Sequence, residues 1–142
     1  MTSLIYGYGD TGKSFERYLE DKKIDFEIFD SNISEYNLNY NFQEFDQILC
    51  SPGISKDIFE NIQSQNTNIF TDVDIFFNED RSIKIGITGT NRKSTTAFHL
   101  HQLFKKYKSS NLIGNIGNTM LDYINNGKKF SIIELSSFQL DK

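Results

Sequence analysis

The chain has 142 residues, 37% of them hydrophobic and 24% charged, a balance that suits one modest globular domain or two small ones. Its formal net charge of −4 argues against a protein that binds nucleic acid through bulk electrostatics. There is no N-terminal signal pattern, and no apolar run approaches the roughly 18 residues of a membrane span. These features predict no nucleic-acid or membrane partner and a reducing, cytoplasmic location.

The first half of the sequence predicts a parallel α/β arrangement, because short apolar strands alternate with helical patterns. Strands are expected at 3–6, 25–29, 47–50 and 68–70. Helices are expected at 14–22 and 55–65, with a short apolar helical turn at 73–77. Residues 31–46 are rich in Asn and weakly patterned, which suggests one edge strand and a turn. Cys50 ends an apolar run and is interpreted as a small buried hydrophobe.

Residues 78–81 are the best candidate for a linker, and a second α/β unit is expected to begin at residue 82. The chain would then hold a Rossmann-like parallel-sheet domain at 1–81 and the truncated start of a P-loop-type ATPase domain at 82–142. The expected elements of the second unit are strands at 82–88, 111–114 and 130–134 and helices at 95–106 and 119–126. Three strands and two helices can bury only a small apolar area. We therefore expect an incomplete domain whose exposed faces can self-associate.

The turn Gly7-Tyr8-Gly9-Asp10-Thr11-Gly12 fits the pattern G-x-G-x-x-G between a strand and a helix, which is typical of a dinucleotide or diphosphate site. The same glycines suit any tightly packed strand–helix turn, so the motif alone is a weak signal. Asp30 ends the next strand, where it either accepts hydrogen bonds from a ribose or serves as a turn residue. Ser51, Pro52 and Gly53 follow a third strand and form either part of a ligand site or a simple Pro-Gly turn.

The strongest signal is the segment 86–96, in which a strand, a tight polar turn, Lys-Ser and a helix form the arrangement of a phosphate-binding loop. Lys93 is placed to reach terminal phosphates, and Ser94 is placed to hold Mg²⁺. The spacing is shorter than the usual G-x-x-x-x-G-K-[ST], and Arg92 stands where such loops carry Gly. We expect Arg92 to suppress productive use of ATP even where it permits anion binding.

Two further polar residues end strands of the second unit. Glu134 follows an apolar run near the loop, where a carboxylate suits Mg²⁺ coordination beside Ser94 or simply faces solvent. Asn115 lies in a Gly-flanked turn, and turn chemistry alone is enough to explain it.

In combination and in this order, the motifs resemble the Mur ligases, and within that family the members that add D-glutamate. The segments that carry the resemblance are 7–14 (GYGDTGKS), 51–54 (SPGI), 71–76 (TDVDIF), 86–91 (GITGTN), 93–95 (KST), 114–117 (GNIG) and 134–140 (ELSSFQL). The resemblance covers essentially the whole chain, but only the opening part of such an enzyme.

The resemblance implies a role for each motif. The residues implied to hold the UDP part of UDP-N-acetylmuramoyl-L-alanine are Asp10, Thr11, Asp30, Ser51, Pro52 and Gly53. The residues implied to bind ATP and Mg²⁺ are Gly89, Thr90, Asn91, Lys93, Ser94 and Thr95, with Lys93 catalytic and with Ser94 and Glu134 as metal ligands. Those implied to face the muramoyl-alanine end are Asn115, Ser136 and Gln139.

In the family, ATP phosphorylates the substrate carboxylate and the amine of D-glutamate attacks the acyl phosphate. The expected function is therefore that of an N-terminal part of an ATP-dependent ligase of peptidoglycan precursor synthesis, inactive alone, with the D-glutamate site outside this chain. One alternative is a non-catalytic remnant that binds a nucleotide sugar. Another is a nicotinamide-binding Rossmann domain, which is disfavoured because the second phosphate loop has no role in it.

Overall fold

The computed structural model describes residues 1–140, apart from the side chain of Phe138. Two compact units make up the chain, Met1–Ile75 and the segment from Phe76 onward. Both are α/β with parallel sheets, which confirms the expected α/β, parallel-sheet part of the fold class. The division falls inside a helix, a few residues before the boundary that the sequence suggested at 81.

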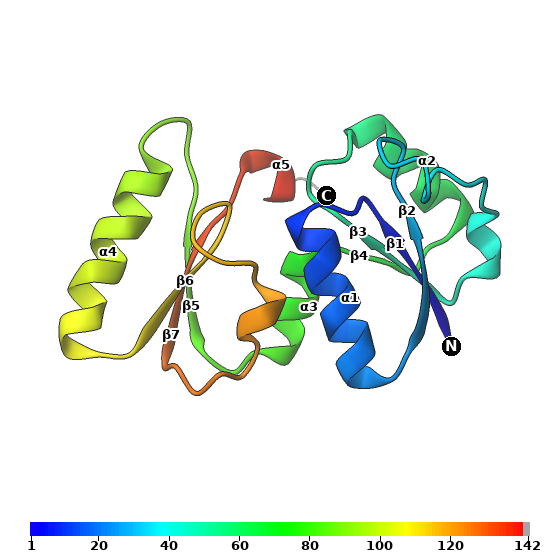
Figure 1. The fold of residues 1–142 in the computed structure, drawn as a ribbon. Helices are drawn as coiled ribbons and strands as arrows, with labels where there is room; N and C mark the ends of the chain where they lie inside the picture. The colour runs from blue at the N-terminus through cyan, green and yellow to red at the C-terminus, as the bar shows by residue number, and fades with distance from the viewer. Residues whose placement is uncertain (141–142) are drawn as a thin grey trace. The chain divides into compact units, whose positions relative to one another are not determined.

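The first unit is a four-stranded parallel sheet in the order β2-β1-β3-β4. Its elements in chain order are β1 (Thr2–Tyr6), α1 (Asp10–Lys22), β2 (Asp25–Phe29), a 3₁₀ turn (Phe42–Glu44), β3 (Gln47–Cys50), α2 (Lys56–Gln65), β4 (Ile69–Phe70) and α3 (Asp72–Glu79), which runs into the second unit (Figure 1). The edge strand suggested within 31–46 is wrong. The chain leaving β2 instead turns back at once, and the N–H of Asp30 donates to the carbonyl of Tyr36 at 3.1 Å.

The core of the first unit lies on both faces of its sheet. One face packs against α2 through buried side chains: Leu4, Phe45, Ile48, Cys50, Phe59 and Ile62. Helix α1 covers the other face (Figure 1). Its side chains Phe15 and Leu19 are buried. Strands covered on both sides need unbroken apolar runs, and the sequence provides them in β1 and β3. Cys50 is fully buried in this core, as expected.

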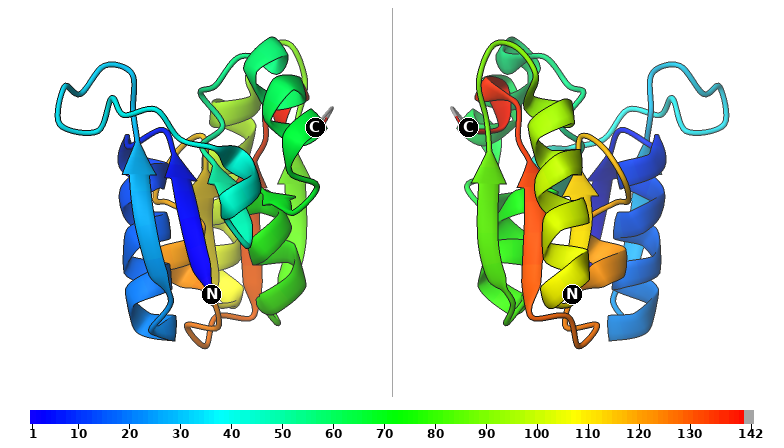
Figure 2. Two further views of the ribbon diagram at one scale, coloured as in Figure 1. Left: turned by 90° about the vertical axis from the view of Figure 1, so that its right-hand side faces the viewer. Right: turned by 90° about the vertical axis from the view of Figure 1, so that its left-hand side faces the viewer.

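The second unit is a three-stranded parallel sheet with β7 in the middle, in the order β5-β7-β6. Its elements are β5 (Ile83–Ile87), α4 (Lys93–Tyr107), β6 (Ser110–Gly114), a 3₁₀ turn (Leu121–Tyr123), β7 (Phe130–Glu134) and α5 (Ser137–Leu140). Helix α4 packs on one face of this sheet, mainly against β6 and β7, as the right-hand view of Figure 2 shows. The helix expected at 119–126 is wrong, because Asn125 takes a left-handed conformation with φ 51° and Gly127 follows with φ 83°.

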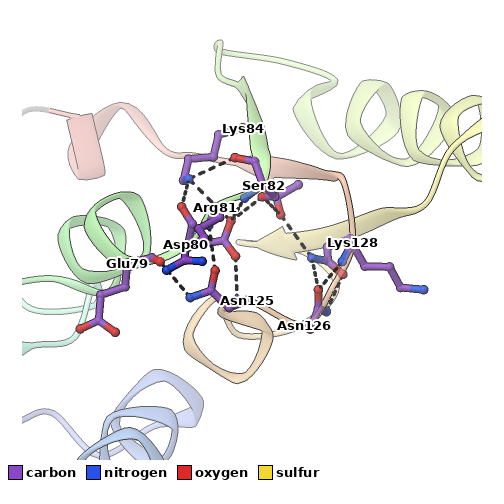
Figure 3. Close-up of polar contacts among 10 residues, drawn as sticks. Glu79, Asp80, Arg81, Ser82, Lys84, Asn125, Asn126 and Lys128 are labelled. Atoms are coloured by element: carbon purple, nitrogen blue, oxygen red, sulfur yellow. Dashed lines mark hydrogen bonds and ion pairs between the residues drawn. The ribbon is translucent and has the colours of Figure 1, made fainter.

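In the segment 78–81, Asn78 and Glu79 end α3, and Asp80 and Arg81 connect that helix to β5. Asp80 is buried, and its Oδ1 accepts the backbone N–H of Asn125 at 2.8 Å while Oδ2 accepts that of Ser82 at 2.9 Å. The ammonium of Lys84 lies 3.6 Å from the same Oδ2 and donates to the carbonyl of Asp80 (Figure 3). Burial works to raise the pKa of Asp80, but the hydrogen bonds from Ser82 and Asn125 and the charge of Lys84 outweigh it, so that its pKa lies below the usual value.

From Asp80 a line of polar contacts crosses the starts of the three strands. The hydroxyls of Ser82 and Ser131 lie 2.7 Å apart, and the Asn111 amide donates to Ser131 at 3.2 Å. The amide of Asn126 closes the line by donating to Asn111 at 2.9 Å (Figure 3). These contacts connect the 124–129 loop to the strands. Ser131 and Asn111 are almost completely buried, so water cannot replace the hydrogen bonds between them.

Candidate functional site

A cavity of about 390 Å³ lies in the first unit, where β1, β2 and β3 end. All six residues expected at the UDP site line it: Asp10, Thr11, Asp30, Ser51, Pro52 and Gly53. The parallel register explains this meeting, because Tyr6 pairs with Phe29 on one side and with Cys50 on the other. The three following turns therefore share one edge of the sheet, which is where open α/β sheets bind ligands.

The glycine turn is shaped for close approach. Gly7 has φ +91°, and a Cβ on Gly12 would collide with the carbonyl oxygen of Gly7. Around Gly9, by contrast, nothing lies within 4 Å of where a Cβ would stand. No described side chain caps α1 at Gly9, so the N–H groups of its first turn remain available to an anion.

Asp30 holds the glycine turn in place. Its Oδ2 accepts the N–H of Tyr8 at 2.7 Å and its Oδ1 accepts that of Asn32 at 2.8 Å. These two hydrogen bonds, Tyr8 first, lower the pKa of Asp30 despite some burial, so the group is anionic at neutral pH. A carboxylate offers about four lone-pair positions, so Asp30 retains acceptor capacity for a ligand hydroxyl.

Ser51, which directly follows β3, also holds the glycine turn in place. Its hydroxyl donates to the carbonyl of Gly7 at 2.6 Å, and its N–H donates to that of Tyr6 at 3.0 Å. The side chain is almost fully buried, so its main task is to join the turn at 51–53 to the glycine turn.

Several other residues line this cavity to which the sequence assigned no role at the site, although Tyr8 and Ile54 lie within its motifs. They are Tyr6, Tyr8, Phe29, Ser31, Asn32, Ile54, Ser55 and Ile58. The only signal was positional: most of them lie at or beside the end of a strand that precedes an expected site residue, and Ser55 and Ile58 lie at the start of α2. Their side chains add aromatic, apolar and amide surface to a site that otherwise consists of backbone and carboxylate.

The second unit has a hollow of about 490 Å³ at the expected phosphate loop. Thr88, Gly89, Thr90 and Lys93 line it together with residues of α5. The ammonium of Lys93 donates to the carbonyl of Gly89 at 2.8 Å, which closes the loop on itself. The remaining expected ATP contacts, Asn91, Ser94 and Thr95, are exposed in the same loop and the first turn of α4.

Arg92 is the N-cap residue just before α4 and takes the left-handed conformation, with φ 60° and ψ 18°. The turn thus requires here the backbone geometry that glycine adopts without strain. The guanidinium is exposed to solvent. An Arg at this position therefore carries backbone strain that a Gly would not.

Glu134 lies at the end of the central strand, paired with Ile87 on one side and Gly114 on the other. Its side chain is buried, and Oε2 has no hydrogen-bond partner among the described residues. A buried carboxylate oxygen without a donor is costly unless a cation satisfies it. The described residues contain no group of three or more His, Cys, Asp or Glu side chains that could hold a metal.

The residues expected at the muramoyl-alanine end occupy two separate places. Asn115 is exposed after β6, and its N–H donates to the carbonyl of Glu134 at 3.0 Å. Ser136 and Gln139 instead bond to each other: the Gln139 amide oxygen accepts the N–H of Ser136 at 2.9 Å, and the Ser136 hydroxyl accepts that of Gln139 at 3.2 Å. This reciprocal pair is a capping box for α5, so both have a structural role in addition to the proposed one.

No family model matches the chain. The chain is 34% identical to the UDP-N-acetylmuramoylalanine–D-glutamate ligase of Francisella philomiragia subsp. philomiragia over 145 aligned positions, which cover 97% of this chain and 34% of that protein. The ligase of the same name from Francisella tularensis subsp. novicida is 35% identical, with the same coverage of both chains. The chain therefore spans about a third of the length of the curated relatives it matches. No helix among residues 1–140 is long and apolar enough to cross a membrane.

Proposed function

We propose that this chain, which is homologous to the D-glutamate-adding Mur ligases along 97% of its residues, is the N-terminal portion of such a ligase. Its first unit would bind UDP-N-acetylmuramoyl-L-alanine and its second unit would contribute to an ATP site. One observation carries the proposal: three separate turns meet in a single cavity beside an uncapped helix N-terminus. A diphosphate is the kind of ligand that such a site holds best.

Within the first unit, the backbone of the glycine turn and the start of α1 would receive the diphosphate, because a Cβ is absent where the backbone must come close. Asp30 would accept a ribose hydroxyl, as its carboxylate is held in place and ionised by the N–H groups of Tyr8 and Asn32. Thr11 would add a hydroxyl at the mouth of the same turn.

Within the second unit, Gly89, Thr90, Asn91, Lys93, Ser94 and Thr95 would surround the phosphates of ATP. The unpartnered oxygen of Glu134 supports the assignment of a Mg²⁺ ligand there, together with the hydroxyl of Ser94. When bound, the ion would neutralise phosphate charge. The task of Lys93 would be to leave the carbonyl of Gly89 and place its ammonium against a terminal phosphate. D-glutamate would bind in parts of the ligase that this chain does not contain.

Calorimetric titration of the intact chain with UDP, and with NAD for comparison, tests the first assignment. We expect weak binding of UDP, with a dissociation constant of about 1 mM or below, and no preference for NAD. The double variant Thr11→Ala, Asp30→Ala should weaken binding, whereas exposed changes Asp21→Ala and Thr67→Ala should not. Absence of heat with UDP at millimolar concentration would show that the cavity is not a uridine-diphosphate site.

Phosphate release separates a working ligase portion from a non-catalytic nucleotide-sugar-binding remnant. The chain is joined to a complete C-terminal portion of a family enzyme and supplied with ATP, Mg²⁺, D-glutamate and UDP-N-acetylmuramoyl-L-alanine. Release that depends on D-glutamate supports the ligase. UDP binding without any release supports the remnant.

A further inference from the structure

Tyr8, the residue between the first two glycines, makes contacts with three different parts of the first unit. Its backbone N–H donates to Asp30 at 2.7 Å. Its hydroxyl donates to the carboxylate of Glu16 on α1 at 2.5 Å. Its ring meets that of Tyr36 edge to face, with 5.1 Å between centroids. Tyr8 also lines the cavity, so these contacts fix one wall of the candidate site.

The segment 30–36, which Tyr8 touches at both ends, is folded into a closed loop. The N–H of Ile33 donates to the carbonyl of Asp30 at 3.2 Å, and that of Tyr36 donates to Ile33 at 2.9 Å. The N–H of Asp30 returns to Tyr36 at 3.1 Å. Because the loop is internally bonded, whatever holds Asp30 and Tyr36 holds the residues between them.

Those intervening residues include two of the cavity's side-chain donors and acceptors. Ser31 and Asn32 both line the cavity and are exposed there. A hydroxyl and an amide together offer donors and acceptors, which is what recognition of the polar edge of a pyrimidine base requires. The phosphate end of a nucleotide would lie at the start of α1, which leaves this wall for the base or sugar.

We propose that Tyr8 is a positioning residue for base recognition: by holding Glu16 and Tyr36 together, it keeps the 30–36 loop against the glycine turn, so that Ser31 and Asn32 discriminate the base. This inference rests on the proposed binding of a uridine nucleotide. Tyr8 itself acts through the loop. The hydrogen bond to Glu16 raises the pKa of Tyr8 to about 12, so its hydroxyl remains a donor throughout the neutral range.

The experiment compares base preference among variants of the intact chain. UDP and CDP are each titrated into the unaltered chain, Tyr8→Phe, Tyr36→Leu, Glu16→Leu and Glu16→Gln, with Tyr107→Phe as the control because Tyr107 is highly exposed on α4. We expect Tyr8→Phe, Tyr36→Leu and Glu16→Leu to weaken UDP binding roughly threefold to tenfold, as for loss of one hydrogen bond. The preference for UDP over CDP should fall toward one. Glu16→Gln keeps an acceptor oxygen and should retain most of the preference.

Hydrogen exchange at Asp30, Ile33 and Tyr36 gives a second measurement, and we expect it to speed up in Tyr8→Phe while the strands stay protected. Equal weakening of UDP and CDP, or an unchanged preference in all three disrupting variants, would overturn the positioning role and leave the UDP site intact. An unaltered chain that binds UDP and CDP equally would also overturn it. An unaltered chain that binds no uridine nucleotide overturns the proposed function, and this inference with it.

Discussion

Replacement of Asp80 by Asn should lower the stability of the second unit, although the two side chains have nearly the same size and shape. Each oxygen of Asp80 accepts a backbone N–H, one from Asn125 and one from Ser82. An amide in either orientation therefore points its NH₂ at an N–H donor. The ammonium of Lys84, whose side chain is 16% exposed, also loses its negative partner (Figure 3).

The size of the effect follows from these two losses. An unsatisfied buried donor costs about 1–3 kcal/mol, and removal of one member of a buried ion pair costs about 3–5 kcal/mol. Since Lys84 keeps its hydrogen bonds to the carbonyls of Asp80 and Ser82, we expect a total of about 2–4 kcal/mol. Adding Lys84→Met to Asp80→Asn should recover part of the loss, because an apolar side chain can keep the contact with the rings of Phe76 and Phe77.

Urea unfolding followed by hydrogen exchange in β5 and β7 reports on this unit separately from the first. The control is Asp25→Asn, an exposed carboxylate at the start of β2, which should change stability by less than about 0.5 kcal/mol. The pH dependence supplies a check of sign. A carboxyl whose pKa is lowered by folding stabilises the folded state above its unfolded pKa near 3.8, and that contribution is lost as the pH falls through the folded pKa. The difference between the unaltered chain and Asp80→Asn should thus be full at pH 7 and shrink below about pH 4. A difference under 0.5 kcal/mol at pH 7, or one that grows in acid, would refute this account of the network.

Three other predictions concern single features of the chain. Arg92→Gly removes left-handed strain and should stabilise the second unit by roughly 0.5–1 kcal/mol; in a version completed with a family C-terminal portion it should also raise phosphate release, and equal rates would show that Arg92 does not hinder the loop. Gly12→Ala should destabilise the first unit by about 1–3 kcal/mol through a clash with the Gly7 carbonyl, while Gly9→Ala, with open space around it, should leave thermal stability nearly unchanged; equal effects of the two would contradict the close-approach argument. The second unit exposes Ile83, Phe98, Leu103 and Tyr107, so sedimentation should show association that rises with concentration and weakens in Leu103→Lys, and a monomer at every concentration would contradict it.

Much of the fold follows from short-range patterns in the sequence. Apolar runs predicted the strands, because a strand that is buried on both faces of a parallel sheet must consist mostly of apolar residues. The 3.6-residue spacing of apolar side chains predicted the helices. The glycine turn and the phosphate-loop pattern also stand out locally, since backbone that approaches an anion closely needs residues without a Cβ at fixed spacing.

Helix and turn boundaries were less well determined by the sequence. The expected helix at 119–126 failed because Asn125 is held in a left-handed conformation by contacts with Glu79, Arg81 and Asp80, more than forty residues away. The apparent linker at 78–81 is the end of α3 and its connection to β5, and the same contacts hold that connection in place. A short polar segment has the same sequence pattern whether its side chains face solvent or bond to residues far away in the chain, so the pattern does not distinguish the two cases.

Only the tertiary structure decided how the site residues are used. The sequence could place Asp30, Ser51 and Glu134 at strand ends, but it left each between a site role and a turn role. The structure shows Asp30 and Ser51 joining three turns around one cavity, whereas Glu134 keeps a buried oxygen without a donor. It also brought in Ser31 and Asn32, which no motif marks, and Tyr8, which is only a variable position of the glycine motif. The reason is physical: what a polar side chain does depends on which donors and acceptors folding brings within hydrogen-bond distance, and most of those lie far away in the chain.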